Sequence, residues 1–498
     1  MENQLKRKYG LLMAMCMVVG TIIGSGIFFR NEQIIAIAGG RMWVGIAAWG
    51  IGGLIALSFA YVVGVLSTRH EKMGGLIDYS EALVGKKYAY VFGWFMATIY
   101  YPSLTGILAW VSARFTVELL GWHTSAGINQ FTSGETWAIA LFYLVAIYTL
   151  NAISPKLSAI LQISGTFIKV IPLILMGVVG TIVGLVNGVT LENLNFVADE
   201  AISTIGIRGN ASAFFYALAA TVFAYAGWDC VMNLNSEIRD SKKNLPKALV
   251  GGMLIIAAIY TMYFIGIFSA ESVSVTAAPG GTREAFMTLF SPVAGTLLFV
   301  FIICSCIGTL NGLIVGGQRS FYAIATRDVG PKPKVLRQVD SETNVPNNST
   351  TISAFMVAAW MLIIFANASN SSVFENFSFN IANLVPVAFN AMFIPIYFMV
   401  IVKQDDLGIF NRFIAPIFAV LGAAFLVFTV FYTERMTVFW FYLVFAALSS
   451  FGLLLTYGKN KTKFKNAWMW IVVLVALIPV IWIFILLFNV FLSFFNLT

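Results

Sequence analysis

The chain has 498 residues, of which 59% are hydrophobic and only 10% carry a charge. This composition predicts an all-α polytopic membrane protein and excludes a soluble domain built around one core. The net charge of +8 does not indicate a nucleic-acid partner, because most basic residues lie in alternate connections between hydrophobic segments. Basic clusters occur within residues 6–8, 69–87, 239–247, 327–337 and 459–465. By the positive-inside rule, we expect the N-terminus in the cytoplasm.

Hydrophobic segments of spanning length follow one another along the chain, and each predicts a transmembrane helix. The expected spans cover residues 10–38, 42–66, a third segment that ends near 119, 136–152, 156–187, 212–237, 246–269, 293–326, 351–367, 374–402, 411–432, 437–457 and 467–493. A short amphipathic piece at 77–84 precedes the third span. A count of thirteen leaves the C-terminus outside, and a count of twelve returns it to the cytoplasm.

The first segment is interrupted in its middle by Gly24-Ser25-Gly26. Glycine permits backbone angles that end a helix, and a broken helix at membrane depth needs surrounding protein or a polar cavity. The N-terminus of the outer half, at residues 25–27, would offer free N–H groups to an anion. The carbonyls of the inner half, near residues 21–22, would attract a cation. A carboxylate beside an ammonium fits both ends, whereas the alternative is a glycine pair for helix packing.

A second interruption, Ala226-Gly227-Trp228-Asp229, lies in the sixth segment. Because five spans are an odd number, a second set of five would begin on the opposite membrane face and be inverted. We therefore predict a transport core over residues 1–402, with repeats at about 10–187 and 212–402, followed by additional helices over 403–498. Interrupted helices at matching positions of two inverted halves indicate a transporter's substrate site.

Several motifs resemble those of a known superfamily. Residues 20–28, Gly-Thr-Ile-Ile-Gly-Ser-Gly-Ile-Phe, resemble the first-helix motif of amino acid–polyamine–organocation (APC) permeases. Residues 223–228, Phe-Ala-Tyr-Ala-Gly-Trp, resemble the sixth helix of the L-type amino acid transporters, whereas Asp229-Cys230 with Glu237 is similar to the cationic amino acid transporter branch. Residues 241–246 and 311–328 are similar to the loop after helix six and the end of helix eight. The resemblance implies a 5+5 inverted-repeat (LeuT-type) fold with about 12–13 transmembrane helices.

The resemblance also implies a substrate site around the two interruptions. Main-chain N–H groups of Ser25, Gly26 and Ile27 would hold the substrate carboxylate, assisted by the Ser25 hydroxyl. The substrate ammonium would bind main-chain carbonyls of four residues, which are Thr21, Ile22, Phe223 and Ala224. Phe223 would in addition gate the site from outside.

Three further positions are candidates for lining the site. The small side chain of Ala226 leaves room for a neutral substrate side chain. Trp228 lines the site or, alternatively, only packs within the helix bundle. Asn380, in the tenth segment, resembles a polar lining position.

Lys169 is a charged residue deep in the fifth segment, where burial is costly without partners. It resembles the fifth-helix lysine that sodium-independent members of the superfamily carry in place of a bound ion. It would bridge the first and eighth helices through carbonyls near Ile22 and the hydroxyls of Ser305 or Thr309. The alternatives are a lysine that carries a coupling proton or one that snorkels to an interface.

Two acidic residues of the sixth segment are further candidates. Asp229 would either bond free backbone N–H groups at the interruption or face a cationic substrate or a proton. Glu237 lies at the cytoplasmic end among basic residues, which favours a gate or a structural ion pair over contact with substrate.

The sequence predicts no cofactor and no metal site, because the two histidines lie in loops and the four cysteines lie within hydrophobic segments. No cleavable signal peptide is expected, since the apolar run after residues 6–8 is too long. We find no nucleotide-binding loop and no His/Asp/Ser constellation, which argues against an ATP-driven pump and an enzyme.

We therefore predict a secondary active transporter of amino acids in the plasma membrane that works by alternating access. It would be sodium-independent and would operate by exchange or proton symport, with an amino acid and the lipid bilayer as its only implied partners. A polyamine or amine carrier is the alternative, although the carboxylate clamp favours amino acids. A membrane sensor or a channel on the same fold is a further alternative, but we find no ring of selectivity groups.

Overall fold

The computed structural model describes residues 9–69, 75–122, 133–203, 209–278, 280–368, 381–434 and 436–457, together with Arg7, Ile471 and Val475. Within these ranges the protein is helical, and the one strand-like contact is an isolated bridge between Tyr9 and Ile238. The helices are α1 (Leu11–Ile22), α2 (Gly26–Ile37), α3 (Met42–Ser67), α4 (Leu76–Leu83), α5 (Lys86–Phe95), η1 (Met96–Tyr100), α6 (Tyr101–Leu119), α7 (Gly134–Ile153), α8 (Pro155–Val186), α9 (Val189–Leu194), α10 (Asn210–Val222), η2 (Phe223–Tyr225), η3 (Trp228–Glu237), α11 (Ser241–Ala270), α12 (Val273–Thr276), α13 (Gly281–Leu289), α14 (Pro292–Ala325), α15 (Pro333–Leu336), α16 (Asn347–Ala368), α17 (Ile381–Lys403), η4 (Phe410–Ile414), α18 (Ala415–Glu434) and α19 (Met436–Tyr457).

The predicted spans are found in the described part of the chain. Ten helices there are long and apolar enough to cross a membrane, and the first and sixth segments are interrupted as the sequence predicts. The short piece predicted at 77–84 is α4. The tenth span is described only from Ile381 onward, and the thirteenth, predicted at 467–493, lies outside the described residues except for Ile471 and Val475.

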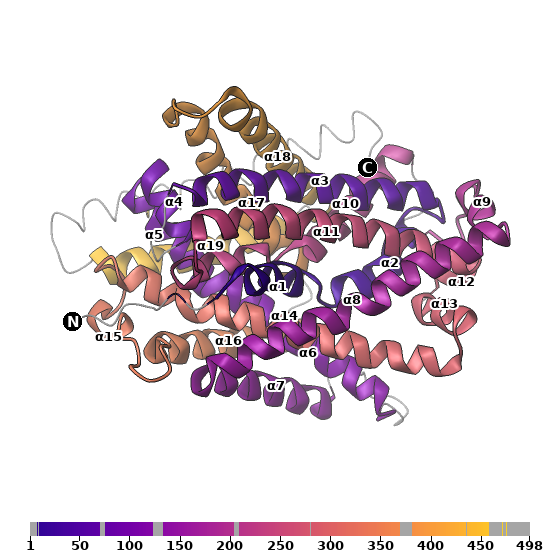
Figure 1. The fold of residues 1–498 in the computed structure, drawn as a ribbon, viewed down its shortest axis with the longest axis horizontal. Helices are drawn as coiled ribbons and strands as arrows, with labels where there is room; N and C mark the ends of the chain where they lie inside the picture. The colour runs from indigo at the N-terminus through magenta and orange to yellow at the C-terminus, as the bar shows by residue number, and fades with distance from the viewer. Residues whose placement is uncertain are drawn as a thin grey trace.

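Two groups of helices surround α1 and α2. The first group contains α3, α10 and α11, of which α10 and α11 both pack against α3, and α1 packs on α11. The second group contains α6, α7, α14 and α16, which also contact one another. Helix α8 packs on both α11 and α14 and so joins the groups. Figure 1 shows α1 and α2 in the middle of the molecule, between α11 and α14. The division into two inverted repeats stays a prediction.

The first break lies between α1 and α2. Helix α1 ends at Ile22, and the next residue, Ile23, turns to an extended conformation with ψ of 91°. Helix α2 then begins at Gly26, directly after Ser25. A β-carbon on Gly24 would lie 3.2 Å from the Thr309 hydroxyl of α14. Glycine at this position therefore lets the non-helical backbone between α1 and α2 lie close to α14.

The second break touches the first. Gly227 has φ of 102°, a left-handed conformation that favours glycine, and it separates the short turn η2 from η3. A β-carbon on Gly227 would lie 3.0 Å from the Thr21 side chain and 3.2 Å from the Thr21 carbonyl oxygen. Glycine at this position therefore lets the sixth segment lie directly against the end of α1.

Candidate functional site

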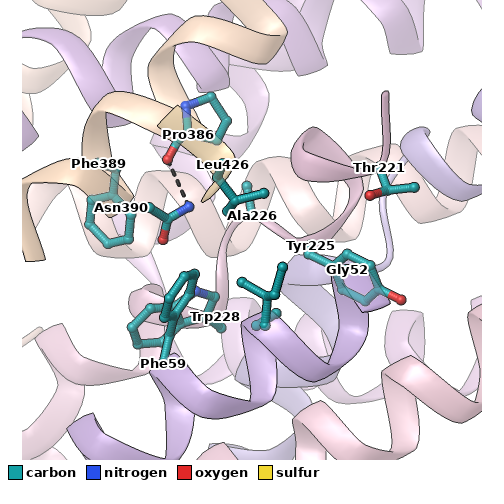
Figure 2. A pocket seen from close by; sticks show the side chains of 12 residues that line it. Gly52, Phe59, Thr221, Tyr225, Ala226, Trp228, Pro386, Phe389, Asn390 and Leu426 are labelled. Carbon is teal, nitrogen blue, oxygen red and sulfur yellow. Dashed lines mark hydrogen bonds between the residues drawn. The ribbon is translucent and has the colours of Figure 1, made fainter. Parts of the chain in front are cut away.

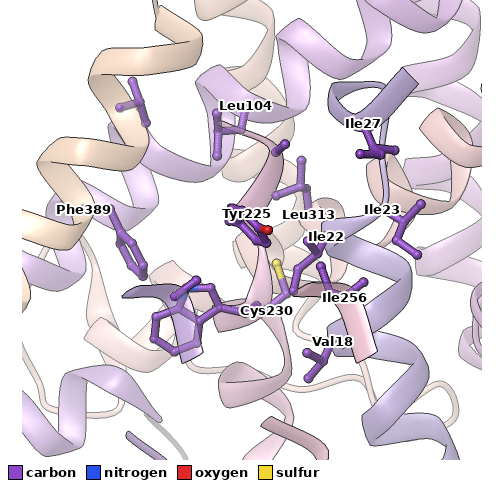
Figure 3. Packing of buried hydrophobic residues seen from close by; sticks show 14 of the residues in the cluster. Val18, Ile22, Ile23, Ile27, Leu104, Tyr225, Cys230, Ile256, Leu313 and Phe389 are labelled. Carbon is purple, nitrogen blue, oxygen red and sulfur yellow. The ribbon is translucent and has the colours of Figure 1, made fainter. Parts of the chain in front are cut away.

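A small cavity lies between the two breaks and encloses about 330 Å³ of space, counting the part that is open to solvent. It is bounded by the two interrupted segments and by α6 and α14. Figure 3 shows Ile22 and Tyr225 beside Leu104 and Leu313, which close it from the neighbouring helices. Of the predicted substrate residues, those that line it are Thr21, Ile22, Ser25, Gly26, Ala224 and Ala226. We call this space the substrate pocket.

The end of the pocket that is predicted to bind an anion is the N-terminus of α2. The first N–H groups of a helix have no intrahelical acceptor, and the helix dipole places partial positive charge there. The Ser25 hydroxyl is buried beside the thiol of Cys306, and among the described residues it has no other hydrogen-bond partner. A substrate carboxylate would find donors at this end. Ile27 is also buried, but its side chain does not line the pocket, and its carbonyl accepts a bond from Asn31.

The end that is predicted to bind a cation is the C-terminus of α1, where the main-chain carbonyls have different partners. The Ile22 carbonyl accepts a hydrogen bond of 3.1 Å from the Tyr260 hydroxyl of α11. The sequence reading missed Tyr260, although a tyrosine inside an apolar span signals a hydroxyl that needs a partner. The side chain of Phe223 and the whole of Asn380 lie outside the described part of the structure.

Lys169 of α8 is completely buried, and its ammonium lies beside the first break. It donates to the carbonyls of Gly20 (2.5 Å), Ile23 (2.6 Å) and Ser305 (3.0 Å). The Thr309 hydroxyl lies 3.4 Å from the ammonium and itself donates to the Ile23 carbonyl at 2.8 Å. Snorkelling to an interface is therefore excluded.

The predicted bridge from α8 to the first segment and α14 is present, with one difference. The carbonyls near Ile22 that Lys169 reaches are those of Gly20 and Ile23, whereas Ser305 contributes its main-chain carbonyl and not its hydroxyl. The Ser305 hydroxyl donates to the Ile23 carbonyl instead. The Lys169 side chain has room beside α14 because position 308 is glycine, where a β-carbon would lie 3.0 Å from the ammonium nitrogen.

Asp229 does not line the substrate pocket, and its carboxylate faces two tyrosines of the third segment. It is fully buried and accepts hydrogen bonds from Tyr100 (2.6 Å) and Tyr101 (2.7 Å), one on each oxygen. Consecutive residues of a regular α-helix point about 100° apart. The π-helical turn η1, which ends at Tyr100, changes this spacing and lets both hydroxyls reach one carboxylate. Among the described residues, the hydrogen-bond donors to this carboxylate are thus the two tyrosine hydroxyls and the N–H of residue 229 itself.

Replacing Asp229 by asparagine should destabilise the protein. The amide can accept only one of the two hydroxyl protons and brings a donor against the other hydroxyl. Because hydrogen bonds to charged groups contribute about 1.5–3 kcal/mol each, we expect the free energy of unfolding to fall by roughly 2 kcal/mol. Thermal unfolding of the purified protein in detergent measures this change. With Tyr100→Phe as background, the same substitution should cost clearly less, and equal costs in both backgrounds would contradict the predicted coupling.

Glu237 forms a buried ion pair with Arg319. The sequence predicts a gate or an ion pair for Glu237 but does not identify its partner. The guanidinium of Arg319 donates to the carboxylate over 2.7 Å, and both side chains are at most 4% exposed. The backbone of Tyr9 bonds the same segment, since its N–H donates to the Glu237 carbonyl and its carbonyl accepts from Arg239. Burial, and secondarily the charge of Glu237, raises the pKa of the Tyr9 phenol to about 12, so this hydroxyl stays protonated at neutral pH. We call Tyr9, Glu237 and Arg319 the inner seal.

A second polar cluster joins α2 to α17 and, through Asn383, to α18. Arg30 donates to Asn383 at 3.3 Å, and the Asn383 amide donates to Glu434 at 3.0 Å. Glu32, one turn of α2 away from Phe28, accepts from the main-chain N–H groups of Gly280 and Thr282 at the start of α13. Helix α2 is therefore tied to α13, α17 and α18 by polar contacts.

Trp228 is buried and does not line the substrate pocket. Its ring contacts Phe389 and Phe393 of α17 at centroid distances of 6.0 and 5.8 Å. It lines a second cavity on the opposite side of Ala226, which Figure 2 shows. Among the described residues, no group of three or more His, Cys, Asp or Glu side chains is arranged to hold a metal ion.

Comparison with known proteins matches this chain to transporters. Residues 9–438 match the family described as amino acid permease. The chain is similar to the "Serine/threonine exchanger SteT" of Bacillus subtilis (strain 168), with 30% identity over 79% of this chain and 84% of that protein. It is 27% identical to the "Cystine/glutamate transporter" of Homo sapiens, over 69% of this chain and 65% of that protein. It is 25% identical to the "b(0,+)-type amino acid transporter 1" of Mus musculus, over 69% and 67% respectively.

Proposed function

The chain belongs to the amino acid permease family and is a multi-pass membrane transporter of amino acids, and from this premise we propose that it is a sodium-independent exchanger. We propose further that it acts in the plasma membrane by alternating access, with its N-terminus in the cytoplasm. The bias of basic residues toward alternate connections supports this orientation.

The observation that carries the proposal is the position of the Lys169 ammonium. In transporters with broken helices, unwound backbone carbonyls coordinate the coupling cation. Here the carbonyls of Gly20, Ile23 and Ser305 bind a fixed ammonium instead. A side-chain cation that is always present removes the need for a sodium ion, so the gradient of sodium has no site through which to drive transport.

The substrate is held as a zwitterion in this proposal. Its carboxylate binds the N-terminus of α2 at Ser25 and Gly26, and its ammonium lies toward the carbonyls of Thr21 and Ala224. No acidic side chain lines the described part of the substrate pocket. A polyamine would have no carboxylate for the α2 end and no acid to balance its charges, which favours amino acids.

Alternating access requires that the two sides of the pocket open in turn. The inner seal joins the start of the chain and the sixth segment to α14, and the cluster of Arg30, Asn383 and Glu434 joins α2 to α17 and α18. We propose that these two sets of contacts break alternately as the group of α1, α3, α10 and α11 moves against the group of α6, α7, α14 and α16.

Uptake into proteoliposomes tests the proposal. Radiolabelled serine should enter vesicles loaded with unlabelled amino acid much faster than empty vesicles, and replacing sodium by choline should leave the rate unchanged. Putrescine serves as the control substrate and should not enter.

Proton symport is the second candidate, and the buried carboxylate of Asp229 is the observation that favours it. If uptake into empty vesicles is driven by an inward proton gradient, the protein is a proton symporter and not an exchanger. A rate that depends on sodium would contradict the role proposed for Lys169.

A further inference from the structure

A second cavity adjoins the substrate pocket. It lies between α3, the broken sixth segment, α17 and α18, and it encloses about 380 Å³ of space, counting the part that is open to solvent. Ala226 lines both spaces, so its methyl group and the backbone of the second break lie at the boundary between them. Figure 2 shows the second cavity with Ala226 between Asn390 on one side and Tyr225 on the other. A group attached to a substrate at the first break would reach the second cavity by passing Ala226.

The second cavity contains an acceptor that has no donor. The Asn390 side chain is only 8% exposed and donates through its amide nitrogen to the Pro386 carbonyl at 2.9 Å. Its amide oxygen is buried, and within the described ranges nothing donates to it. Figure 2 shows this oxygen on the side of Trp228, away from Pro386. Buried polar atoms of proteins nearly always have a partner, so this oxygen indicates a donor that binds here.

Three other residues of the lining carry polar groups, namely Thr221, Tyr225 and Trp228. The Tyr225 hydroxyl donates to the Trp49 carbonyl at 2.7 Å, and Thr221 offers an acceptor. The Thr221 hydroxyl donates its proton to the Leu218 carbonyl at 2.8 Å, which leaves its lone pairs free. The remaining walls are mainly apolar, with Phe59, Phe389 and Leu426 among them, and no charged side chain is part of the described lining.

We propose that the second cavity receives the side chain of the transported amino acid and that Asn390 selects uncharged side chains that donate a hydrogen bond. Hydroxyl and primary amide side chains satisfy the Asn390 oxygen. A carboxylate offers only acceptors, and a cationic side chain would be buried without a counter-charge. This inference rests on the proposed function, because the substrate must first be held at the two breaks.

The first test removes the acceptor without changing the size of the residue greatly. Asn390→Leu should lower the kcat/KM for uptake of threonine and glutamine about tenfold, which is the effect of losing one hydrogen bond. Uptake of alanine, whose methyl group does not reach the oxygen, should stay within about twofold. Phe398→Leu, at an exposed position of the same helix, is the matched control for expression and insertion.

The second test adds a charge and gives a gain of function. Asn390→Asp supplies an acceptor that also balances a cation, so lysine or ornithine should begin to compete with threonine for uptake. In the unmodified protein they should compete poorly. This test stays informative where Asn390→Leu does not fold, because the aspartate preserves the shape of the side chain.

The outcomes separate the subsite from the transport function. Equal losses for alanine, threonine and glutamine in Asn390→Leu would show a packing role and overturn the subsite, while alanine exchange would still support the proposed function. Unchanged threonine and glutamine uptake in Asn390→Leu would also overturn the subsite. An unmodified protein that exchanges no amino acid would instead overturn the proposed function, and the subsite with it.

Discussion

Replacing Lys169 by methionine is expected to abolish transport, with a loss of at least about 100-fold in the rate of exchange. Methionine fills a similar volume but removes the ammonium that donates to the carbonyls of Gly20, Ile23 and Ser305. A hydrogen bond to a charged group contributes about 1.5–3 kcal/mol, and three such bonds would be lost beside one break. The broken backbone between α1 and α2 would then lose the geometry that aims the α2 N-terminus at a carboxylate. Exchange of radiolabelled serine in proteoliposomes measures the effect.

Lys156→Met is the matched control, because Lys156 is exposed at the start of the same helix. It should exchange serine like the unmodified protein. Gly308→Ala provides an independent check, since its β-carbon would lie 3.0 Å from the Lys169 nitrogen and would push the ammonium from its place. If Lys169→Met retained more than a third of the exchange rate at a normal protein level, the ammonium would not be needed for the transport cycle.

The elements of the site that the sequence predicts are those with a local signal. Gly24, Gly26 and Gly227 interrupt apolar runs, and an interruption in a span is visible in the sequence whatever the neighbours are. Lys169 is visible for the same reason, because a charge inside an apolar segment needs partners. Both signals depend on the membrane, because a charged or helix-breaking residue within an apolar span is costly and therefore rare.

The partners of these residues depend on packing between distant segments, which the sequence does not display. Nothing in the third segment indicates the π-helical turn that brings Tyr100 and Tyr101 onto Asp229. Tyr260 reaches the Ile22 carbonyl only because α11 packs against α1. Asn390 looks like one more polar residue of the tenth span, and only the structure places it beside Ala226 and the second cavity.

The sequence also carries a signal for the inner seal, which is a charged residue inside a predicted span. Arg319 lies inside the predicted eighth span, 293–326, so the rule that identified Lys169 applies to it as well. The acid that pairs with it could be either Asp229 or Glu237 on sequence grounds, and the fold assigns Glu237. A buried pair of this kind also gives the second large expected effect.

Replacing Arg319 by methionine is expected to lower the free energy of unfolding by about 3–5 kcal/mol, because it leaves the Glu237 carboxylate buried beside an apolar side chain. Both side chains of the pair are at most 4% exposed, so water cannot substitute for the guanidinium. Thermal and denaturant unfolding in detergent measure the loss. Exchange should fall together with stability, since the inner seal would no longer hold the sixth segment against α14.

The decisive comparison is the double variant Arg319→Met with Glu237→Gln. Removing the charge of both partners avoids the uncompensated ion, so the double variant should be more stable than Arg319→Met alone, although it carries one more substitution. Arg337→Met, which removes an ion pair with the exposed carboxylate of Asp328, should change stability by less than about 1 kcal/mol. If the double variant were the less stable one, Glu237 would be held by contacts other than Arg319, and the ion pair would not be what holds the end of the sixth segment against α14.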